Sequence, residues 1–265
     1  MSDALTLYGL LDDDEIPIDA VALELSALDH HRASIKPYLE LIDQMAAQVL
    51  ALDSETTTPA HNAAVLVAVL SGENAFTGDR QSYDAPVNAD MIRVFDRRKG
   101  LPISLAIIYV AVARRLGWAA YVVNLPGHVL VSIGEDDTVL IDAFDDGAVL
   151  GVDELDSMRL PGVNRSIVTA QALRMSNRDV LVRLLQNQAS RAEQSGDYER
   201  AVLVYGRMKT VAPDNAQGWS GLVRLQLMFG ATGPARTSLI SLLEITRDPG
   251  ARSQISQVLG NLAGE

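Results

Sequence analysis

The fold is decided by residues 100–117, which read GLPISLAIIYVAVARRLG. Pro102 suits the first turn of a helix, where its missing N–H has no intrahelical partner to lose. Apolar side chains between residues 103 and 113 fall on every side of such a helix, which is typical of a helix at the centre of a core. Gly117 is a C-terminal stop. We predict a buried central helix and not a membrane span, because a span takes about 20 residues.

The hydrophobic pattern changes after this helix. Runs rich in Val, Ile and Leu, bounded by turn residues, predict three strands, at 120–124, 128–133 and 138–142. Residues 134–137 predict a tight hairpin turn, and such a turn would place His128 opposite Asp142. Alternation would then put both side chains on one face of the sheet, together with Leu130 and Leu140.

Helical spacing of apolar residues also precedes the central helix. Pro37 interrupts the pattern and predicts two helices between residues 18 and 52. A third helix is expected over 59–70, ended by Ser71-Gly72, and a short one over 90–98. Helices around a small antiparallel sheet make the expected fold class α+β.

A period of 34 residues marks the end of the chain. Gly196 recurs as Gly230, and two further pairs share this spacing: Ala201 with Ala235, and Tyr205 with Leu239. Trp219 and Pro213 occupy the large-aromatic and terminal-proline places of a tetratricopeptide pattern. We expect Trp219 to belong to the core of helical repeats, with a peptide-binding groove as the alternative.

Composition excludes several classes of function. The net charge of -12 disfavours nucleic acids and anionic membranes as partners, because both repel acidic proteins. The chain has no cysteine, which excludes thiol nucleophiles, disulfides and thiolate metal sites. We expect no cofactor and no metal. The first fifteen residues lack the features of a secretory signal, which predicts a cytoplasmic protein.

Several motifs occur in a recognisable order: Asp96-Arg97-Arg98-Lys99-Gly100-Leu101-Pro102-Ile103-Ser104-Leu105, Leu125-Pro126-Gly127-His128 and Leu140-Ile141-Asp142, preceded by Gly78-Asp79-Arg80 and Tyr83-Asp84. This constellation resembles the transglutaminase-like superfamily and, more closely, the SirB family of bacterial proteins. The resemblance implies a transglutaminase-like (papain-like) α+β module over residues 1–170, including the N-terminal helices. It also implies tetratricopeptide-like helical repeats over residues 171–265.

The superfamily places a nucleophilic cysteine at the start of the buried helix, with a histidine and an aspartate on neighbouring strands. Counting back from Gly117 and Ala106 puts that cysteine at Pro102, which has no nucleophile. Ser104 is the nearest hydroxyl in the first turn, and with His128 and Asp142 it would complete a Ser-His-Asp set.

Each of these residues also has a purely structural interpretation. Serine near a helix start usually satisfies backbone groups, and a histidine opposite an aspartate can simply hold a hairpin in register. The arginines near the two ends of the central helix, Arg97, Arg98, Arg114 and Arg115, either form a basic spot for a carboxylate or phosphate or pair with nearby acids.

Two functions follow from these alternatives. The first is a non-catalytic or regulatory module, a pseudoenzyme of SirB type, that binds a protein or peptide partner through the repeats. The second is a Ser-dependent hydrolase or amidase that uses Ser104, His128 and Asp142. They are distinguished by whether the Ser104 hydroxyl can reach His128.

Overall fold

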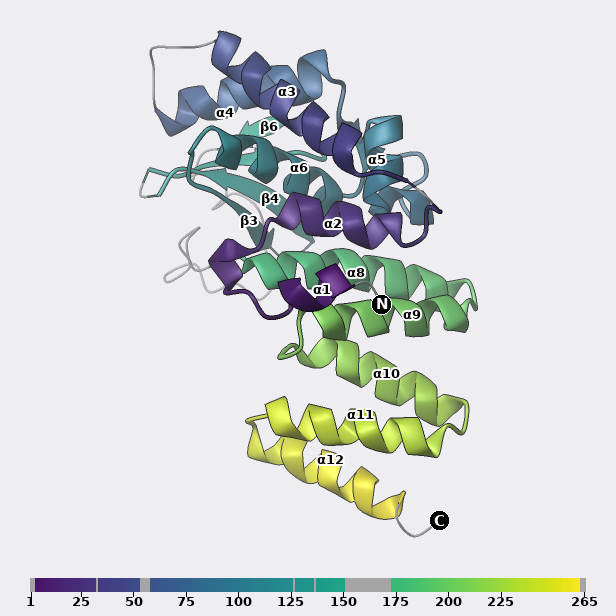
Figure 1. Cartoon of the computed structure of the whole chain (residues 1–265). Coiled ribbons are helices and arrows are strands. Elements are labelled where there is room, and N and C mark those ends of the chain that lie inside the picture. The colour runs from purple at the N-terminus through teal and green to yellow at the C-terminus, as the bar shows by residue number, and fades with distance from the viewer. Residues whose placement is uncertain are drawn as a thin grey trace. The chain divides into compact units, whose positions relative to one another are not determined.

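The computed structural model describes residues 3–31, 33–52, 58–125, 127–135, 137–150 and 173–262. Its contacts divide the chain into two compact units. Figure 1 colours the chain by residue number. Asp13–Val180 form the α+β unit, and Met1–Asp12 join Leu181–Glu265 in the helical unit. The first helix, α1 (Asp3–Tyr8), therefore groups with the C-terminal helices. The sequence had suggested that it belongs to the α+β module. The predicted boundary after residue 170 lies outside the described residues.

Helices and short turns make up most of the α+β unit before its sheet: η1 (Asp13–Glu15), α2 (Ile18–Ala27), α3 (Lys36–Leu52), α4 (Pro59–Val67), η2 (Ala68–Glu73), η3 (Pro86–Ala89), α5 (Met91–Arg97) and α6 (Pro102–Arg115). Two details differ from the predictions. Pro37 lies in the first turn of α3 and does not follow a helix directly. The third helix continues through Gly72 as the π-helical turn η2, so Ser71-Gly72 does not end it.

The buried central helix is confirmed as α6. Every residue from Ile103 to Ala113 is buried, and Pro102 lies in the first turn, as predicted. Gly117 follows with a φ of 73°, a left-handed conformation that glycine adopts without strain. The helix packs on strands β3 (Ala120–Leu125) and β4 (His128–Ile133), so it links the helical layer to the sheet.

The sheet is antiparallel with the strand order β3-β4-β5-β6. The three predicted strands are present, with β5 at Val139–Asp142, and a fourth, β6 (Ala148–Leu150), was not predicted. A separate parallel pair, β1 (Thr77–Gly78) with β2 (Lys99–Gly100), holds the segment before η3 against the start of α6.

The predicted hairpin register is wrong by two residues. Ile133 pairs with Val139 and Val131 with Ile141, so the β4–β5 register does not bring His128 opposite Asp142. His128 pairs instead with Leu125 on β3. The cause is the connection, which spans residues 134–138 and is wider than the tight turn assumed from the sequence. A shift of two residues leaves each side chain on its predicted face, since the strand period is two.

The helical unit contains α1, most of α8 (Asn177–Gln194), α9 (Tyr198–Val211), α10 (Ala216–Met228), α11 (Thr232–Ile245) and α12 (Pro249–Asn261). The 34-residue spacing is matched in backbone and burial. Gly196 and Gly230 both have positive φ, at 79° and 69°. Ala201 and Ala235 are both fully buried, which lets successive helices approach closely.

None of the helices in the described ranges is long and apolar enough to cross a membrane.

Candidate functional site

Ser104 lies in the first turn of α6 and is completely buried. Its Oγ donates a hydrogen bond to the backbone carbonyl oxygen of Asn88 at 2.9 Å. The Leu101 N–H donates to the same carbonyl at 3.1 Å. The hydroxyl therefore joins the start of α6 to η3, satisfies a backbone acceptor, and does not reach solvent.

His128 and Asp142 lie in the sheet, on β4 and β5, and not on α6. His128 is exposed at the start of β4. Asp142 Oδ1 accepts hydrogen bonds from the N–H groups of Phe144 and Asp145, both at 3.0 Å, and so shapes the turn into β6. Within the described part of the chain, no hydrogen bond joins Ser104, His128 and Asp142 in any combination. The structure does not assemble the Ser-His-Asp set.

The position of His128 on the sheet also bears on whether it can meet Ser104. Leu130 and Leu140 form a buried cluster with Val123 and Leu125 of β3. Alternation along β4 puts His128 on the Leu130 face. No α6 residue belongs to this cluster, among those the structure describes. The helix that carries Ser104 and the face that carries His128 therefore do not share this core.

The motif residues that precede α6 form a closed polar network. Asp79 is 4% exposed and makes an ion pair with Arg97, with Nη2 and Oδ2 at 2.5 Å. The Ser82 N–H donates to Asp79 Oδ1 at 3.0 Å. That backbone hydrogen bond, followed by the contacts with Arg97, lowers the pKa of Asp79 against the opposing effect of burial. Asp79 is thus held as a carboxylate that ties two motifs together.

Asn88 completes this network. It is fully buried, and its Oδ1 accepts a hydrogen bond from Arg97 Nη1 at 2.8 Å. Its Nδ2 donates to the carbonyl oxygens of Ser82 and Tyr83 at 2.6 and 3.3 Å. The sequence analysis missed Asn88, although it lies between the Gly78-Asp79-Arg80 motif and the Asp96–Leu105 motif that it connects. The network serves to hold the loop against the helix start.

The four arginines do not form one basic spot. Arg97 is bound to Asp79, and Arg115 pairs with Asp19 at 2.7 Å and with Asp43 at 2.5 Å. Arg98 stacks over Phe76, with 4.6 Å between the guanidinium carbon and the ring centroid. Arg114 differs from Arg97 and Arg115, because it makes no ion pair with a carboxylate anywhere in the described residues.

Arg114 lines a cleft of about 410 Å³ at the C-terminal end of α6. Its Nε donates to the carbonyl oxygen of Ala120 at 3.0 Å, and its Nη1 donates to Asn177 Oδ1 at 2.9 Å. Burial lowers the pKa of Arg114, and the nearby Tyr121, Asp13 and Asp19 oppose that shift. The other lining residues come from η1, from the start of β3 and from the segment before α8: Asp13, Asp14, Trp118, Ala119, Ala120, Tyr121, Arg174, Met175, Ser176 and Asn177.

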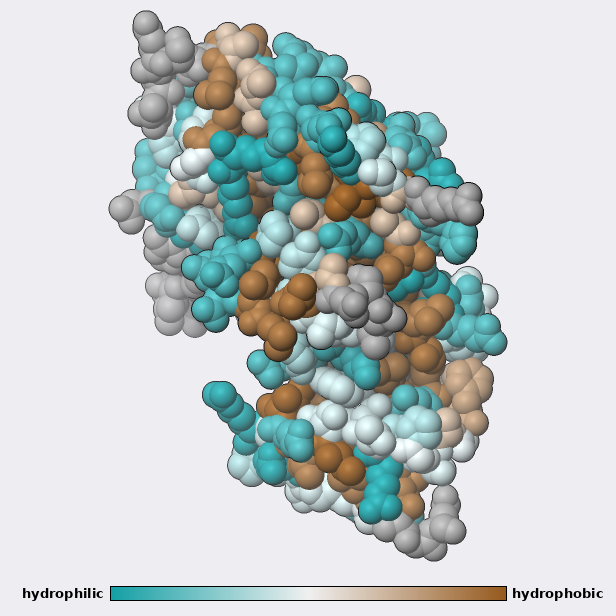
Figure 2. All heavy atoms as spheres, viewed as in Figure 1, coloured by the Kyte–Doolittle hydropathy of each residue, from teal (hydrophilic) through white to brown (hydrophobic). Residues whose placement is uncertain are grey.

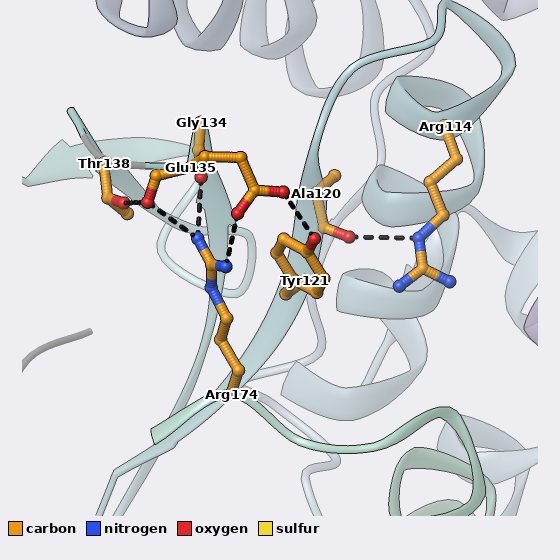
Figure 3. A network of polar contacts seen from close by, with 7 residues as sticks. All are labelled: Arg114, Ala120, Tyr121, Gly134, Glu135, Thr138 and Arg174. Atoms are coloured by element: carbon orange, nitrogen blue, oxygen red, sulfur yellow. Dashed lines mark hydrogen bonds and ion pairs between the residues drawn. The ribbon is translucent and has the colours of Figure 1, made fainter. Parts of the chain in front are cut away.

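One wall of the cleft is held by a polar network, shown in Figure 3. The Arg174 guanidinium stacks over the Tyr121 ring at 3.9 Å, and its Nη1 pairs with Glu135 Oε2 at 2.8 Å. The Tyr121 hydroxyl donates to Glu135 Oε1 at 2.6 Å. This hydrogen bond, and then Arg174, lower the pKa of Glu135. Arg174 is therefore neutralised, whereas Arg114 is not.

Asp13 and Asp14 are the acidic residues among the lining residues of the cleft. Asp13 accepts hydrogen bonds from the backbone N–H groups of Asn177 and Arg178, at 2.8 and 2.9 Å, and so caps the start of α8. Asp14 is exposed, and its side chain makes no hydrogen bond or ion pair with any residue that the structure describes. Among the described residues that line the cleft, the Arg114 guanidinium and the Asp14 carboxylate therefore make no ion pair.

A model of the Transglutaminase-like superfamily matches residues 36–186, which is more than half of the chain and runs from α3 into α8. The chain belongs to the transglutaminase-like superfamily. Both the network around Asn88 and Arg114 of the cleft lie within the matched residues of this transglutaminase-like protein. Membership in the superfamily does not by itself assign a catalytic role to any residue of this chain.

Relatives of this transglutaminase-like chain come from bacteria and animals. A UPF0162 protein of Xylella fastidiosa is 29% identical over 243 residues, which are 89% of this chain and 86% of the relative. A UPF0162 protein of Pseudomonas aeruginosa is 26% identical over 85% of this chain and 83% of its own. F-box only protein 21 of Mus musculus is 31% identical over 48% of this chain, but only 21% of its own length is covered.

Among solved structures, menin covers 77% of this chain and is covered over 60% of its own, at a TM-score of 0.33 and 13% identity. That likeness is too distant for a statement about fold or function.

Proposed function

We propose that this transglutaminase-like protein is non-catalytic and acts in the cytoplasm as a SirB-type module that binds a protein or peptide partner. The observation that carries the proposal is the state of Ser104, which is 0% exposed and donates its hydroxyl to the Asn88 carbonyl. A nucleophile must meet both its substrate and its general base. Ser104 meets neither, and the chain has no cysteine to replace it.

The proposed partner surface is the helical unit, read as tetratricopeptide-like repeats. Its helices expose large apolar side chains that a folded core would otherwise bury, namely Tyr198, Leu203, Met228, Phe229 and Ile240. Figure 2 shows hydrophobic surface interrupting the polar surface over the C-terminal helices. Tyr198 and Phe229 lie in edge-to-face contact, with ring centroids 5.6 Å apart. Aromatic side chains of this kind are enriched at protein interfaces.

Catalysis is tested by labelling the protein with a fluorophosphonate probe, which reacts with activated serines. We expect no labelling of the native protein, or of Ser104→Ala and His128→Ala variants, under conditions that label a serine hydrolase in the same tube. Circular dichroism confirms that each sample is folded. Labelling of the native protein that both substitutions abolish would establish the Ser-dependent hydrolase or amidase and overturn the proposal.

Partner binding is tested with the full chain immobilised as bait in a cytoplasmic extract. We expect specific partners to be lost when Phe229→Ser removes an exposed aromatic from the helical unit. Val149→Ser is the matched control, because Val149 is also exposed, at 43%, but belongs to the α+β unit. Equal losses in the two variants, or none in either, would contradict a partner surface on the helical unit.

A further inference from the structure

The cleft at the C-terminal end of α6 has the size and lining of a small-ligand site. Its volume of about 410 Å³ falls within the range of roughly 300–1,000 Å³ that such sites occupy. Trp118, Tyr121 and Met175 supply apolar surface, and Arg114, Asp14 and Asn177 supply polar groups. All of these residues belong to the α+β unit.

Arg114 retains donors for a ligand. Its Nε and Nη1 are bonded to Ala120 and Asn177, and its Nη2 makes no hydrogen bond with a described residue. The Arg114 side chain is half-buried and lines the cleft. The two hydrogen bonds from Nε and Nη1 fix the plane of the guanidinium, which leaves Nη2 as a preorganised donor for a carboxylate.

The charges of the cleft select the kind of anion. Arg174 is neutralised by Glu135, and the Asp13 carboxylate is committed to capping α8. Asp13 keeps its negative charge, which also acts on Arg114. The cleft is further lined by the exposed Asp14, which makes no ion pair with Arg114. A dianion such as phosphate would meet one cation and two nearby carboxylates, and would be disfavoured. A molecule with one positive and one negative end matches both unpaired groups.

We infer that this cleft binds a small zwitterion of dipeptide size, with its carboxylate on Arg114, its ammonium group on Asp14 and its side chain against Trp118 and Tyr121. The inference does not depend on the proposed partner surface, because that surface belongs to the helical unit. Arg114 and Asp14 are binding residues here, and no covalent step is involved.

The fluorescence of Trp118 reports on the site. The chain has two tryptophans, and the other, Trp219, donates its Nε1–H to the Pro213 carbonyl in the helical unit. A Trp219→Phe background therefore isolates the Trp118 signal. The probes are the dipeptide Ala-Phe, its N-acetyl form, which lacks the ammonium group, and its C-terminal amide, which lacks the carboxylate.

We expect saturable quenching or enhancement with Ala-Phe. Amidation should weaken binding about tenfold, because it removes a half-buried charge-assisted hydrogen bond. Acetylation should weaken it about threefold, because Asp14 is exposed and screened. In Asp14→Asn the free and acetylated dipeptides should bind equally, and in Arg114→Gln the free and amidated dipeptides should do so. A merely structural role for either residue would not produce this matched loss of discrimination.

Two results would overturn the inference. One is no change in Trp118 fluorescence with any of the three probes up to about 10 mM, a concentration that detects even weak binding. The other is equal affinity for the free, acetylated and amidated dipeptides, which would show that the ends are not recognised. Because these comparisons use the same protein, they hold even if Arg114→Gln fails to fold.

Discussion

The two ends of α6 use polar side chains in opposite ways. At the N-terminal end, Asp79, Asn88, Arg97 and Ser104 bond to one another or to backbone, and the network is closed. At the C-terminal end Arg115 is paired with carboxylates, but Arg114 bonds to two neutral acceptors, lines a cleft and makes no ion pair with a described residue. The difference separates structural polar groups, which satisfy each other, from groups that remain available to a ligand.

Asn88→Ala should have the largest effect on stability, because it breaks the centre of the closed network. It removes the hydrogen bonds that Asn88 donates to the carbonyl oxygens of Ser82 and Tyr83 and the one that it accepts from Arg97 Nη1. Arg97 keeps its ion pair with Asp79. We expect a loss of about 3–5 kcal/mol in the free energy of unfolding, measured by urea denaturation. Asn124→Ala, at an exposed position of β3, is the control and should change stability by less than about 0.5 kcal/mol. Similar values for both would show that the network is dispensable.

Asp79→Asn should cost about 2–3 kcal/mol at neutral pH, because it leaves Arg97 without its carboxylate. The pKa of Asp79 is lowered in the folded protein, so its stabilisation is fully present above the ordinary carboxyl pKa of about 4. That stabilisation is lost as the pH falls below this value toward the folded pKa. The gap between native and Asp79→Asn proteins should therefore narrow in denaturation curves recorded at decreasing pH. A gap that does not change with pH would rule out this ionic contribution.

Ser104→Ala should cost about 1 kcal/mol, the typical net value of one buried hydrogen bond. The loss is limited because the Asn88 carbonyl keeps its bond from the Leu101 N–H. Thermal unfolding of the variant beside the native protein measures it. An unchanged or raised Tm would mean that the hydroxyl is kept for a reason other than packing the start of the helix.

Arg114→Gln should have the smallest effect on stability, within about 1 kcal/mol of the native protein. The hydrogen bonds that it loses are partly offset by relief from the burial of a guanidinium that makes no ion pair with a described residue. Urea denaturation measures the free energy of unfolding of this variant beside that of Arg97→Gln. Arg97→Gln should lose more of that free energy, because it removes an ion pair with a buried carboxylate. An equal loss at both ends of α6 would remove the distinction between a structural and an available arginine.

Much of the architecture could be predicted because it depends on local patterns. The all-apolar run predicted α6, and runs rich in Val, Ile and Leu between turn residues predicted β3, β4 and β5. The short strand β6 was missed because three residues, Ala148–Leu150, are too few for an alternating pattern to stand out. The hairpin register was missed because residues 134–138 form a wider connection than their turn-like composition suggested.

The candidate site was harder to predict, because its contacts join residues that are far apart in the chain. Arg115 pairs with Asp19, 96 residues away, and Arg114 bonds to Asn177, 63 residues away. Four arginines with similar neighbours therefore had four different environments, which no local pattern could distinguish. The motif around Gly78-Asp79-Arg80 was visible, but the role of Asn88 between the two motifs was not.

By itself, the sequence determined that the chain has no thiol chemistry, that its central helix is buried, and that helices recur every 34 residues near its end. These properties follow from residue identity and periodicity. Only the tertiary structure decided that Ser104 turns to Asn88, that His128 stays exposed, and that Arg114 is the arginine left beside a cleft. Hydrogen bonds and ion pairs form between whichever groups the fold brings within about 3 Å, and long-range packing sets those distances.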